Sequence, residues 1–419
     1  MSTMRPINFQ VIVLWMGLFL TGPSSLFAEE TCRIQSAQDI LDCALQKHPD
    51  VINAQNEKGR DEKLVRVAKQ RPNPELDGRI LTGKNAGDNI LNTETTLLHT
   101  LELGGKRKAR IGQANAFIDK SSVNLRENRE TTALQTVLAL YRLRQIEDEL
   151  SRVHETVATF DKILRAFKSR LKLTPEQEVS SATFELAREE YRLKKAVLIQ
   201  EQSNLSHLLE LATQAPYDQL QKHLPSFKDE WPVLPSDQAI ETSDNATVAK
   251  ARADQHLAET NIGLAKSLAW PDVKIGPTLE TESFTSNTRT IGGVGFSIPI
   301  PILNLNRGEK AFAYADKIRA DTNLDLTLRK TSVERSIQLK RYEAATLALI
   351  QSQPASHLSV QHKNIESFFE RGLVPSTLVI EAHRQLYEIT KTRNEQELTG
   401  IDALWRLYII DGTVFDVKI

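Results

Sequence analysis

Residue patterns that carry catalytic chemistry are scarce in this sequence. Gly104-Gly105-Lys106-Arg107 places two glycines beside two cations, which is superficially like a phosphate-binding loop. No G-x-x-x-x-G-K-[ST] loop occurs, however, and Ser, His and Asp occur without a G-x-S-x-G nucleophile motif. We therefore interpret Gly104–Arg107 as a turn between a strand and a helix. We predict that the protein is not an enzyme and uses no cofactor.

Histidines and cysteines are the remaining candidates for metal or redox chemistry. His357 and His362 are five residues apart, so they do not share a helical face as i,i+4 ligands would. We interpret the nine histidines as surface residues and predict no metal site. Cys32 and Cys43 are the two cysteines, and in an exported chain they either form a disulfide or stay unpaired. The sequence leaves both states open.

Composition limits the possible classes of protein. The 419 residues contain 53 Lys+Arg and 54 Asp+Glu, a balance that gives no electrostatic case for nucleic-acid binding. After residue 28 no apolar run approaches the ~20 residues of a membrane-spanning helix, which excludes a polytopic helical membrane protein.

Residues 1–28 have the pattern of an export signal: Arg5, then an apolar stretch over 9–20, then Ala28 at the expected cleavage site. The alternative is a buried helix at the start of a cytoplasmic protein.

The chain is internally duplicated, which is its most informative property. We predict a first repeat over 29–213, a proline-rich linker over 214–240 and a second repeat over 241–419. Each repeat has a helix, a proline, two segments of alternating polarity, a turn and a long helical hairpin. The predicted strands cover about 76–84, 95–103, 273–283 and 290–300, with a polar loop over 84–89, and the hairpins cover 106–212 and 308–411.

The first long helix has a coiled-coil seam. Its apolar residues are spaced alternately four and three apart, as in a heptad repeat. They are Ala139, Leu143, Ile146, Leu150, Val153, Val157, Phe160, Leu164, Phe167 and Leu171. Such a narrow seam needs neighbouring helices, and four strands with one apolar face cannot close a sheet by themselves. Several chains must therefore share one barrel: two would supply eight strands and three would supply twelve.

With this layout in view, the sequence resembles the TolC family of outer-membrane efflux proteins. The resemblance covers nearly the whole mature chain, and its turns look most like the heavy-metal efflux branch of tripartite systems with an RND pump. The residues that carry it are Ala44-Leu45, His48-Pro49, Pro74, Leu103 to Arg107, Pro271, Pro301-Ile302-Leu303, Asn306-Arg307-Gly308, Gly372 to Pro375 and Leu404 to Thr413.

The resemblance implies a mostly α fold with a small β part. Three chains would form a twelve-stranded transmembrane β-barrel in outer-membrane lipid and an α-helical barrel that extends through the periplasm. The homotrimer would be a passive exit duct for metal ions or small toxic compounds, working with a periplasmic adaptor and an inner-membrane RND pump. The exit duct of a type I protein secretion system is one alternative. A structural coiled-coil protein without a pore is another.

The resemblance also assigns positions along the chain. Residues that would dock the adaptor are Arg170, Lys172, Leu173, Thr174 and Pro175 at the first tip and Arg371, Gly372, Leu373, Val374 and Pro375 at the second. The turns from barrel to helix would be Gly104, Gly105, Lys106 and Arg107, and Asn306, Arg307 and Gly308.

A pore constriction is implied just after the second tip. Family members place acidic residues there. Glu381, nine residues after Gly372, keeps the acid, whereas Leu378, six residues after Gly372, departs from the pattern. Three Glu381 carboxylates in a ring would favour cations. Arg384 would help hold the tip closed. The alternative is that Glu381 is a solvated acid on a helix face that pairs with Arg384 or His383.

Overall fold

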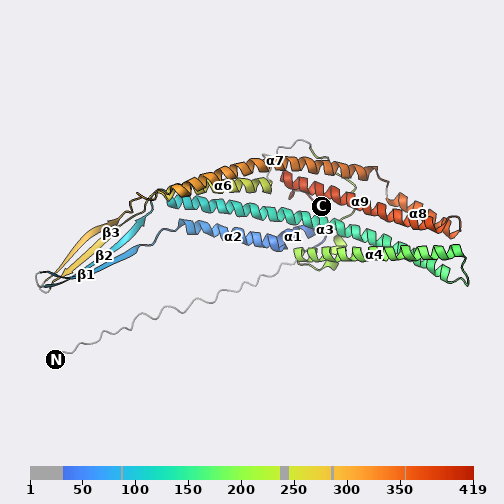
Figure 1. The fold of residues 1–419 in the computed structure, drawn as a ribbon, viewed down its shortest axis with the longest axis horizontal. Coiled ribbons are helices and arrows are strands. Elements are labelled where there is room, and N and C mark those ends of the chain that lie inside the picture. Colours follow the sequence, from blue (N-terminus) through green and yellow to red (C-terminus); the bar gives the residue numbers. More distant parts are fainter. Residues whose placement is uncertain (1–31, 86–87, 236–244, 285–286, 354) are drawn as a thin grey trace, which may run out of the picture.

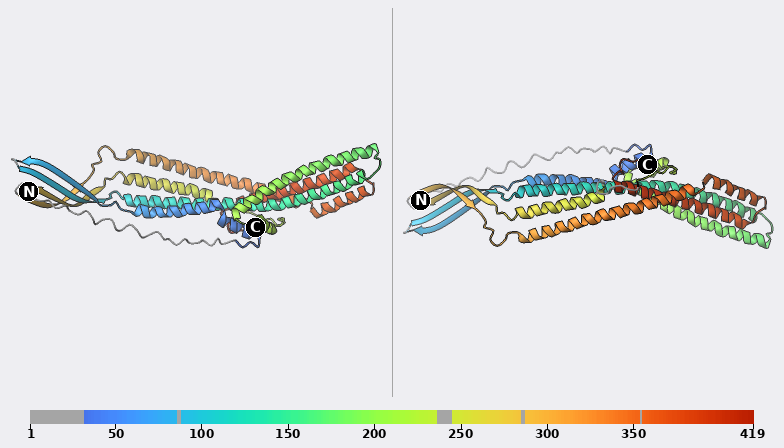
Figure 2. Two further views of the ribbon diagram at one scale, coloured as in Figure 1. Left: turned by 90° about the horizontal axis from the view of Figure 1, so that it is seen from below. Right: turned by 90° about the horizontal axis from the view of Figure 1, so that it is seen from above.

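The computed structural model describes residues 32–85, 88–235, 245–284, 287–353 and 355–419. The predicted export signal lies outside these residues. The molecule is elongated, with a four-stranded sheet at one end and the turns of two helical hairpins at the other (Figure 1). The helices between them run roughly along the long axis in every view (Figure 2). Within the described residues, no helix is both long enough and apolar enough to cross a membrane.

Each repeat opens on helices that end before the prolines preceding the sheet. α1 (Ala37–Lys47) begins at Ser36, whose hydroxyl accepts a hydrogen bond from the Asp39 N–H, as an N-cap does. α2 (Pro49–Lys69) follows directly. In the second repeat α6 (Ala246–Ser267) is the counterpart, and the side chain of Asn245 caps it. The linker contains two short elements that the sequence did not indicate, α5 (Tyr217–Leu220) and a 3-10 turn (Gln221–His223).

The sheet is antiparallel in the order β1-β2-β3-β4. Its strands are β1 (Glu75–Asn85), β2 (Asp88–Leu101), β3 (Val273–Ser283) and β4 (Thr288–Ser297). The repeats therefore meet where β2 pairs with β3. Within the described chain, β1 and β4 each pair on one side only.

The predictions for β2 and β4 were wrong at their boundaries. β2 begins at Asp88 rather than at about residue 95 and ends at Leu101 rather than at about residue 103. The loop expected over 84–89 is largely strand, because Lys84 pairs with Asn89 and the ladder continues to the next pair. Strands are held by backbone hydrogen bonds, so polar composition alone does not end one. β4 ends at Ser297 rather than at residue 300, because Pro299 and Pro301 have no N–H to donate to a ladder.

The two faces of the sheet differ in chemistry. One face carries apolar side chains that are all exposed in the single chain, namely Leu76, Ile80, Leu97, Leu101, Ile275, Leu279, Val294 and Phe296. The other face is polar and makes cross-strand contacts. There the Thr96 and Thr278 hydroxyl oxygens are 2.6 Å apart, and the Asn92 amide donates to Glu280 at 2.7 Å. A sheet with an exposed apolar face and two open edges needs further partners.

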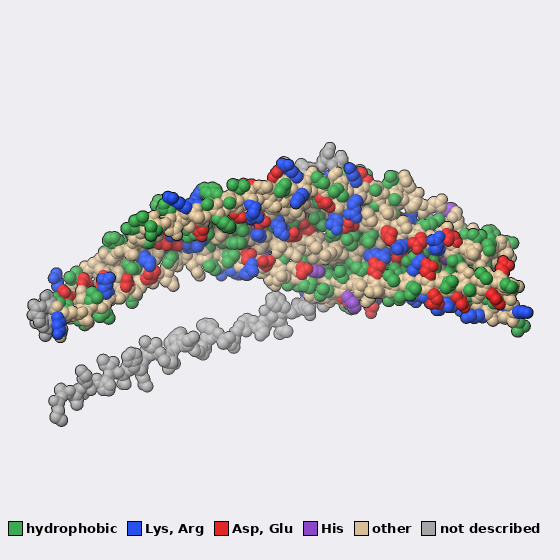
Figure 3. All heavy atoms as spheres, viewed as in Figure 1, with side chains coloured by type: hydrophobic (Ala, Val, Ile, Leu, Met, Phe, Trp, Pro, Cys, Tyr) green, Lys and Arg blue, Asp and Glu red, His purple; other side chains and the backbone are tan. Residues whose placement is uncertain are grey.

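The long hairpins make up the rest of the molecule. The first is α3 (Lys106–Lys168) with α4 (Pro175–Thr213). The second is α7 (Arg307–Gln351) and α8 (Ala355–Glu370), followed by α9 (Ser376–Asp411). At ~1.5 Å per residue, the 63 residues of α3 extend about 95 Å. Acidic and basic side chains are interspersed over the helical body (Figure 3).

The predicted seam of α3 is buried over most of its length. Leu143, Ile146, Val153 and Phe160 are fully buried and pack against the other helices of the hairpins. Leu150, Val157 and Phe167 are half-buried. Leu171 is fully exposed, because α3 ends at Lys168 and Leu171 lies in the turn.

Candidate functional site

The first tip is a short connection closed by a helix cap. Thr174 precedes α4 and forms a capping box with Gln177: its hydroxyl accepts from the Gln177 N–H, and the Gln177 side chain accepts from the Thr174 N–H. Pro175 occupies the first helical position, where a backbone N–H would have no intrahelical acceptor, so its absence costs no hydrogen bond. The cap fixes where α4 starts. Among the predicted tip residues, Arg170, Lys172, Leu173 and Thr174 lie in the connection and Pro175 starts α4.

The second tip is a glycine turn. Gly372 has a φ of +72°, and its N–H and that of Leu373 donate to the carbonyls of Phe369 and Phe368 at 2.8 and 2.9 Å. This arrangement satisfies the last carbonyls of α8. Arg371, Gly372, Leu373, Val374 and Pro375 form the whole connection from α8 to α9.

The two tips contact each other. The Ser376 hydroxyl at the start of α9 lies 3.1 Å from the Ser180 hydroxyl on α4. Both tips also expose a leucine, Leu171 at the first and Leu373 at the second. The structure thus brings the two predicted tips together at one end of the molecule (Figure 1).

The predicted constriction residues lie on the first three turns of α9. Glu381 and Arg384 form a two-pronged pair at 2.8 and 2.9 Å, and Leu378 is exposed one turn earlier. Hydrogen bonds from Arg384 hold the pKa of the Glu381 carboxyl below its ordinary value. Of the two partners considered for Glu381, Arg384 makes the contact, whereas His383 faces the protein interior.

The interpretation of the histidines as surface residues is wrong for two of them. His362 on α8 and His383 on α9 are buried, and their rings meet edge to face with centroids 4.2 Å apart. Both lie near Glu366. His362 and Glu366 are four residues apart on one helix, a spacing visible in the sequence. His383 comes from another helix, so only the folded chain could show the cluster.

The predicted barrel-to-helix turns are tight junctions between sheet and helices. Gly104 and Gly105 have φ values of +69° and +74°, and α3 starts at Lys106. The Lys106 ammonium is buried and paired with Asp272 at 2.6 Å, so it is not available as a phosphate ligand. Arg107 donates to the Lys69 carbonyl at 2.9 Å. In the second repeat Asn306 precedes α7 with a φ of +55°, and Arg307 and Gly308 are the first helical residues.

Cys32 and Cys43 are joined by a disulfide. It ties the start of the described chain to α1, and Cys43 is buried against the end of α4, where its sulfur lies 3.3 Å from the Thr213 carbonyl oxygen.

Known proteins share this arrangement over nearly the whole chain. No protein-family model matches the sequence. The cobalt-zinc-cadmium resistance protein CzcC of Cupriavidus metallidurans is 23% identical over 385 residues, which cover 88% of each chain. The structure of the CmeC outer membrane channel of Campylobacter jejuni superposes with a TM-score of 0.71 at 15% identity, over 90% of this chain and 86% of that one. The channel-forming protein CusC gives 0.70 at 14% identity, over 91% and 93%.

The chain has the TolC-type channel fold. The helical hairpins and the small sheet that the resemblance implies are thereby confirmed. The open-state structure of the Neisseria gonorrhoeae MtrE outer membrane channel also superposes on this chain. The TM-score is 0.66 at 16% identity, over 90% of this chain and 89% of that one.

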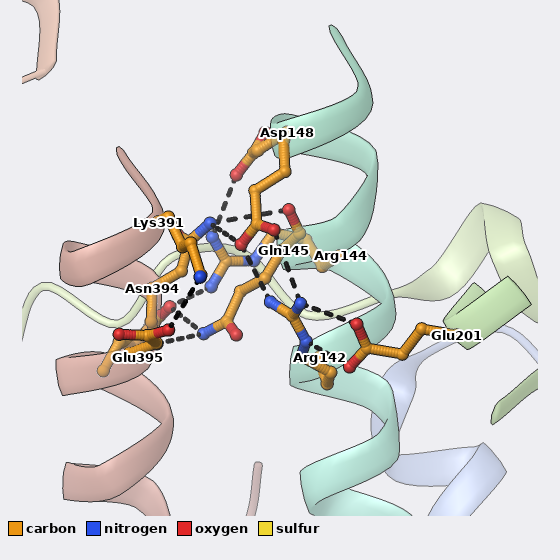
Figure 4. A network of polar contacts seen from close by, with 10 residues as sticks. Arg142, Arg144, Gln145, Asp148, Glu201, Lys391, Asn394 and Glu395 are labelled. Atoms are coloured by element: carbon orange, nitrogen blue, oxygen red, sulfur yellow. Dashed lines mark hydrogen bonds and ion pairs between the residues drawn. The ribbon is translucent and has the colours of Figure 1, made fainter. Parts of the chain in front are cut away.

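In this TolC-type chain the middle of the helical body is held by a buried polar network (Figure 4). Arg142 on α3 bridges Glu149 at 2.8 Å and Glu201 on α4 at 2.7 Å. Asn394 on α9 donates to Glu149 at 3.0 Å. The network joins three helices that are otherwise in contact through apolar seams, and it fixes their register.

A second part of the same network centres on a fully buried carboxylate. Glu397 on α9 pairs with Arg144, accepts from the Gln145 amide at 2.8 Å and accepts from the Lys228 backbone N–H at 2.9 Å. Lys228 belongs to the linker, so Glu397 binds helix α3 and the linker at once. Charges this deeply buried need such partners.

Substituting Gly104 by alanine is expected to destabilise the TolC-type fold more than the same change at Gly105. Both positions have positive φ, which costs an alanine about 1–2 kcal/mol. At Gly104 the added Cβ would also lie 2.5 Å from the Trp270 side chain, whereas nothing lies within 4 Å at Gly105. Overpacking adds about 1–3 kcal/mol. Chemical unfolding of both variants measures the difference, and equal losses would contradict the contact with Trp270.

Proposed function

We propose that this chain is the outer-membrane channel of a tripartite efflux system, a passive exit duct for metal ions or small toxic compounds. The observation that carries the proposal is the sheet. Its apolar face is exposed and both its edges are open, at the end of a helical body with the TolC-type fold. A homotrimer would close twelve strands into one barrel and cover the edges, with the apolar face toward outer-membrane lipid.

In this proposal the helices form a long periplasmic tube and supply no catalytic group. A periplasmic adaptor would dock on the two tips, where Leu171 and Leu373 are exposed, and an inner-membrane RND pump would provide the energy. CzcC, the relative with 23% identity, is named for cobalt-zinc-cadmium resistance, which supports metal ions as the cargo class. The constriction would lie on the first turns of α9, near Glu381.

Purification from outer membranes and planar-bilayer recording test the proposal. We expect a trimer-sized particle in detergent and single channels of small conductance that open rarely, because the tips are closed without the adaptor. A water-soluble monomer or dimer without conductance would reject the duct and favour a structural coiled-coil protein. Type I secretion would be favoured instead if deleting the protein abolished export of a polypeptide and left tolerance to metals and drugs unchanged.

A further inference from the structure

Within the described chain, three side chains near the second tip have the composition of a metal site. His362 and Glu366 lie one turn apart on α8, and His383 comes from α9. One ligand atom from each lies within 4.8 Å of the others. Both imidazoles are at least nine-tenths buried, and Glu366 is the member that reaches solvent.

The nitrogens that face this cluster have no hydrogen bonds to the described residues. Both ring nitrogens of His362 and Nε2 of His383 are buried and make no hydrogen bond of regular geometry, although the two Nε2 atoms lie close to the Glu366 carboxylate. Buried polar atoms of this kind are rare in folded proteins, and an ion or water is a common reason for them. Without a proton or an ion between the rings and the carboxylate, the cluster is therefore not a satisfied element of the core.

Thr156 on α3 determines which nitrogen of His383 is free to bind. Its hydroxyl donates to the Arg152 carbonyl at 2.9 Å, and a hydroxyl has only one proton to give. The contact of 3.1 Å between Thr156 Oγ1 and His383 Nδ1 must then use the proton on Nδ1. In the neutral ring the lone pair is on Nε2, which points toward the carboxylate of Glu366.

Two lone pairs facing each other repel unless a proton or a metal ion lies between them. His383 Nε2 is 3.1 Å from Glu366 Oε1, and His362 Nε2 is 3.5 Å from the same oxygen. Tetrahedral Zn²⁺ with bonds of about 2.0–2.1 Å keeps neighbouring ligand atoms about 3.3 Å apart. The two observed distances lie on either side of that value.

We propose that His362, Glu366 and His383 form a binding site for a divalent transition-metal ion of the zinc class. Two imidazole nitrogens and one carboxylate oxygen suit Zn²⁺ or Co²⁺, with water as the fourth ligand on the side where Glu366 reaches solvent. The ion would link α8 to α9 behind the turn at Gly372. It would be a fixed structural ion within each chain and not the transported cargo.

The site does not depend on the proposed duct, because all of its ligands belong to one chain. It would stiffen the hairpin that carries the second tip. Thr156 acts on the metal only through His383, so it is a positioning residue.

The test is metal binding by the purified full-length mature protein after chelator treatment. With Zn²⁺ as the probe in titration calorimetry, we expect one ion per chain and a rise in melting temperature. With Co²⁺ we expect the intense visible absorption of a four-coordinate ion. His362→Asn and His383→Gln should each weaken binding by at least about 100-fold, and Thr156→Val by about 10-fold. The matched control is His357→Gln, an exposed histidine on α8 that contacts Gln353 and should leave binding unchanged.

Several results would overturn the site. The first is the absence of Zn²⁺ binding at micromolar concentration. The second is an equal affinity in the wild type and both histidine variants, and the third is the weak visible spectrum of six-coordinate Co²⁺. The first result would mean that a proton, and not a metal, lies between His383 and Glu366. If a histidine variant does not fold, Glu366→Gln keeps the side-chain shape at the open side of the cluster and should lose binding. Conductance is recorded separately, so failure of the duct proposal leaves this result interpretable.

Discussion

Replacing Glu397 by alanine is expected to lower the free energy of unfolding by about 3–5 kcal/mol. Glu397 is fully buried, and its removal leaves the Arg144 guanidinium without its buried partner and the Lys228 N–H without an acceptor. Arg144 then keeps only the largely exposed carboxylate of Asp148, at 3.1 Å, and losing the compensation of a buried charge costs far more than losing a surface pair. Urea unfolding of the detergent-solubilised protein, followed by circular dichroism, measures the change.

A matched control lies two residues away on the same helix. Glu395 is exposed and contacts Lys391 at 3.7 Å, so Glu395→Ala should change stability by less than about 0.5 kcal/mol. Joint replacement of Arg144 by methionine and Glu397 by leucine should recover much of the loss, because no buried charge then remains unpaired. A Glu397→Ala protein within about 1 kcal/mol of wild type would show that water reaches this part of the network.

Reversing the charge of Arg384 should open the proposed duct and make it cation-selective. In Arg384→Glu the pair with Glu381 is lost, and each chain of a trimer presents two acids at the start of α9. The ring would repel itself and raise the local cation concentration by about tenfold or more. Single-channel conductance and reversal potential in a planar bilayer are the measurements.

The same site gives a pH dependence with a definite sign. Hydrogen bonds from Arg384 and Gln385 hold the pKa of Glu381 below its ordinary value. In Arg384→Gln the larger of these contributions is lost and neighbouring carboxylates repel, so the pKa rises. Cation selectivity is then present above that raised pKa and lost as pH falls through it, at a higher pH than in wild type.

The control for charge reversal is a similar pair at the other end of α9. Arg406 contacts Asp402 at 2.8 Å, four residues apart on the helix surface. Arg406→Glu changes the net charge by the same amount far from the tip and should leave conductance near the wild-type value. If both reversals act alike, or neither acts, the constriction is not at Glu381 and Arg384.

The sequence by itself determined the order and type of the elements. Period-two alternation marked four strands, and a heptad seam marked α3, because these patterns are set by which face of each element is buried. Prolines and glycines marked the turns at residues 104–105 and 372–375 through their limited or unusual backbone angles. Some boundaries differed from the prediction, because backbone pairing extended β1 and β2 into residues that looked like a polar loop.

Only the tertiary structure decided which side chains meet across the sequence. Glu397 finds Arg144, 253 residues away, and His383 finds Thr156, 227 residues away. No local pattern encodes such pairs, since a helix surface shows only its own i,i+3 and i,i+4 neighbours. The sequence placed Glu381 near the second tip by position, but the choice of Arg384 as its partner and the burial of His362 and His383 were fixed by how α8 and α9 pack on α3.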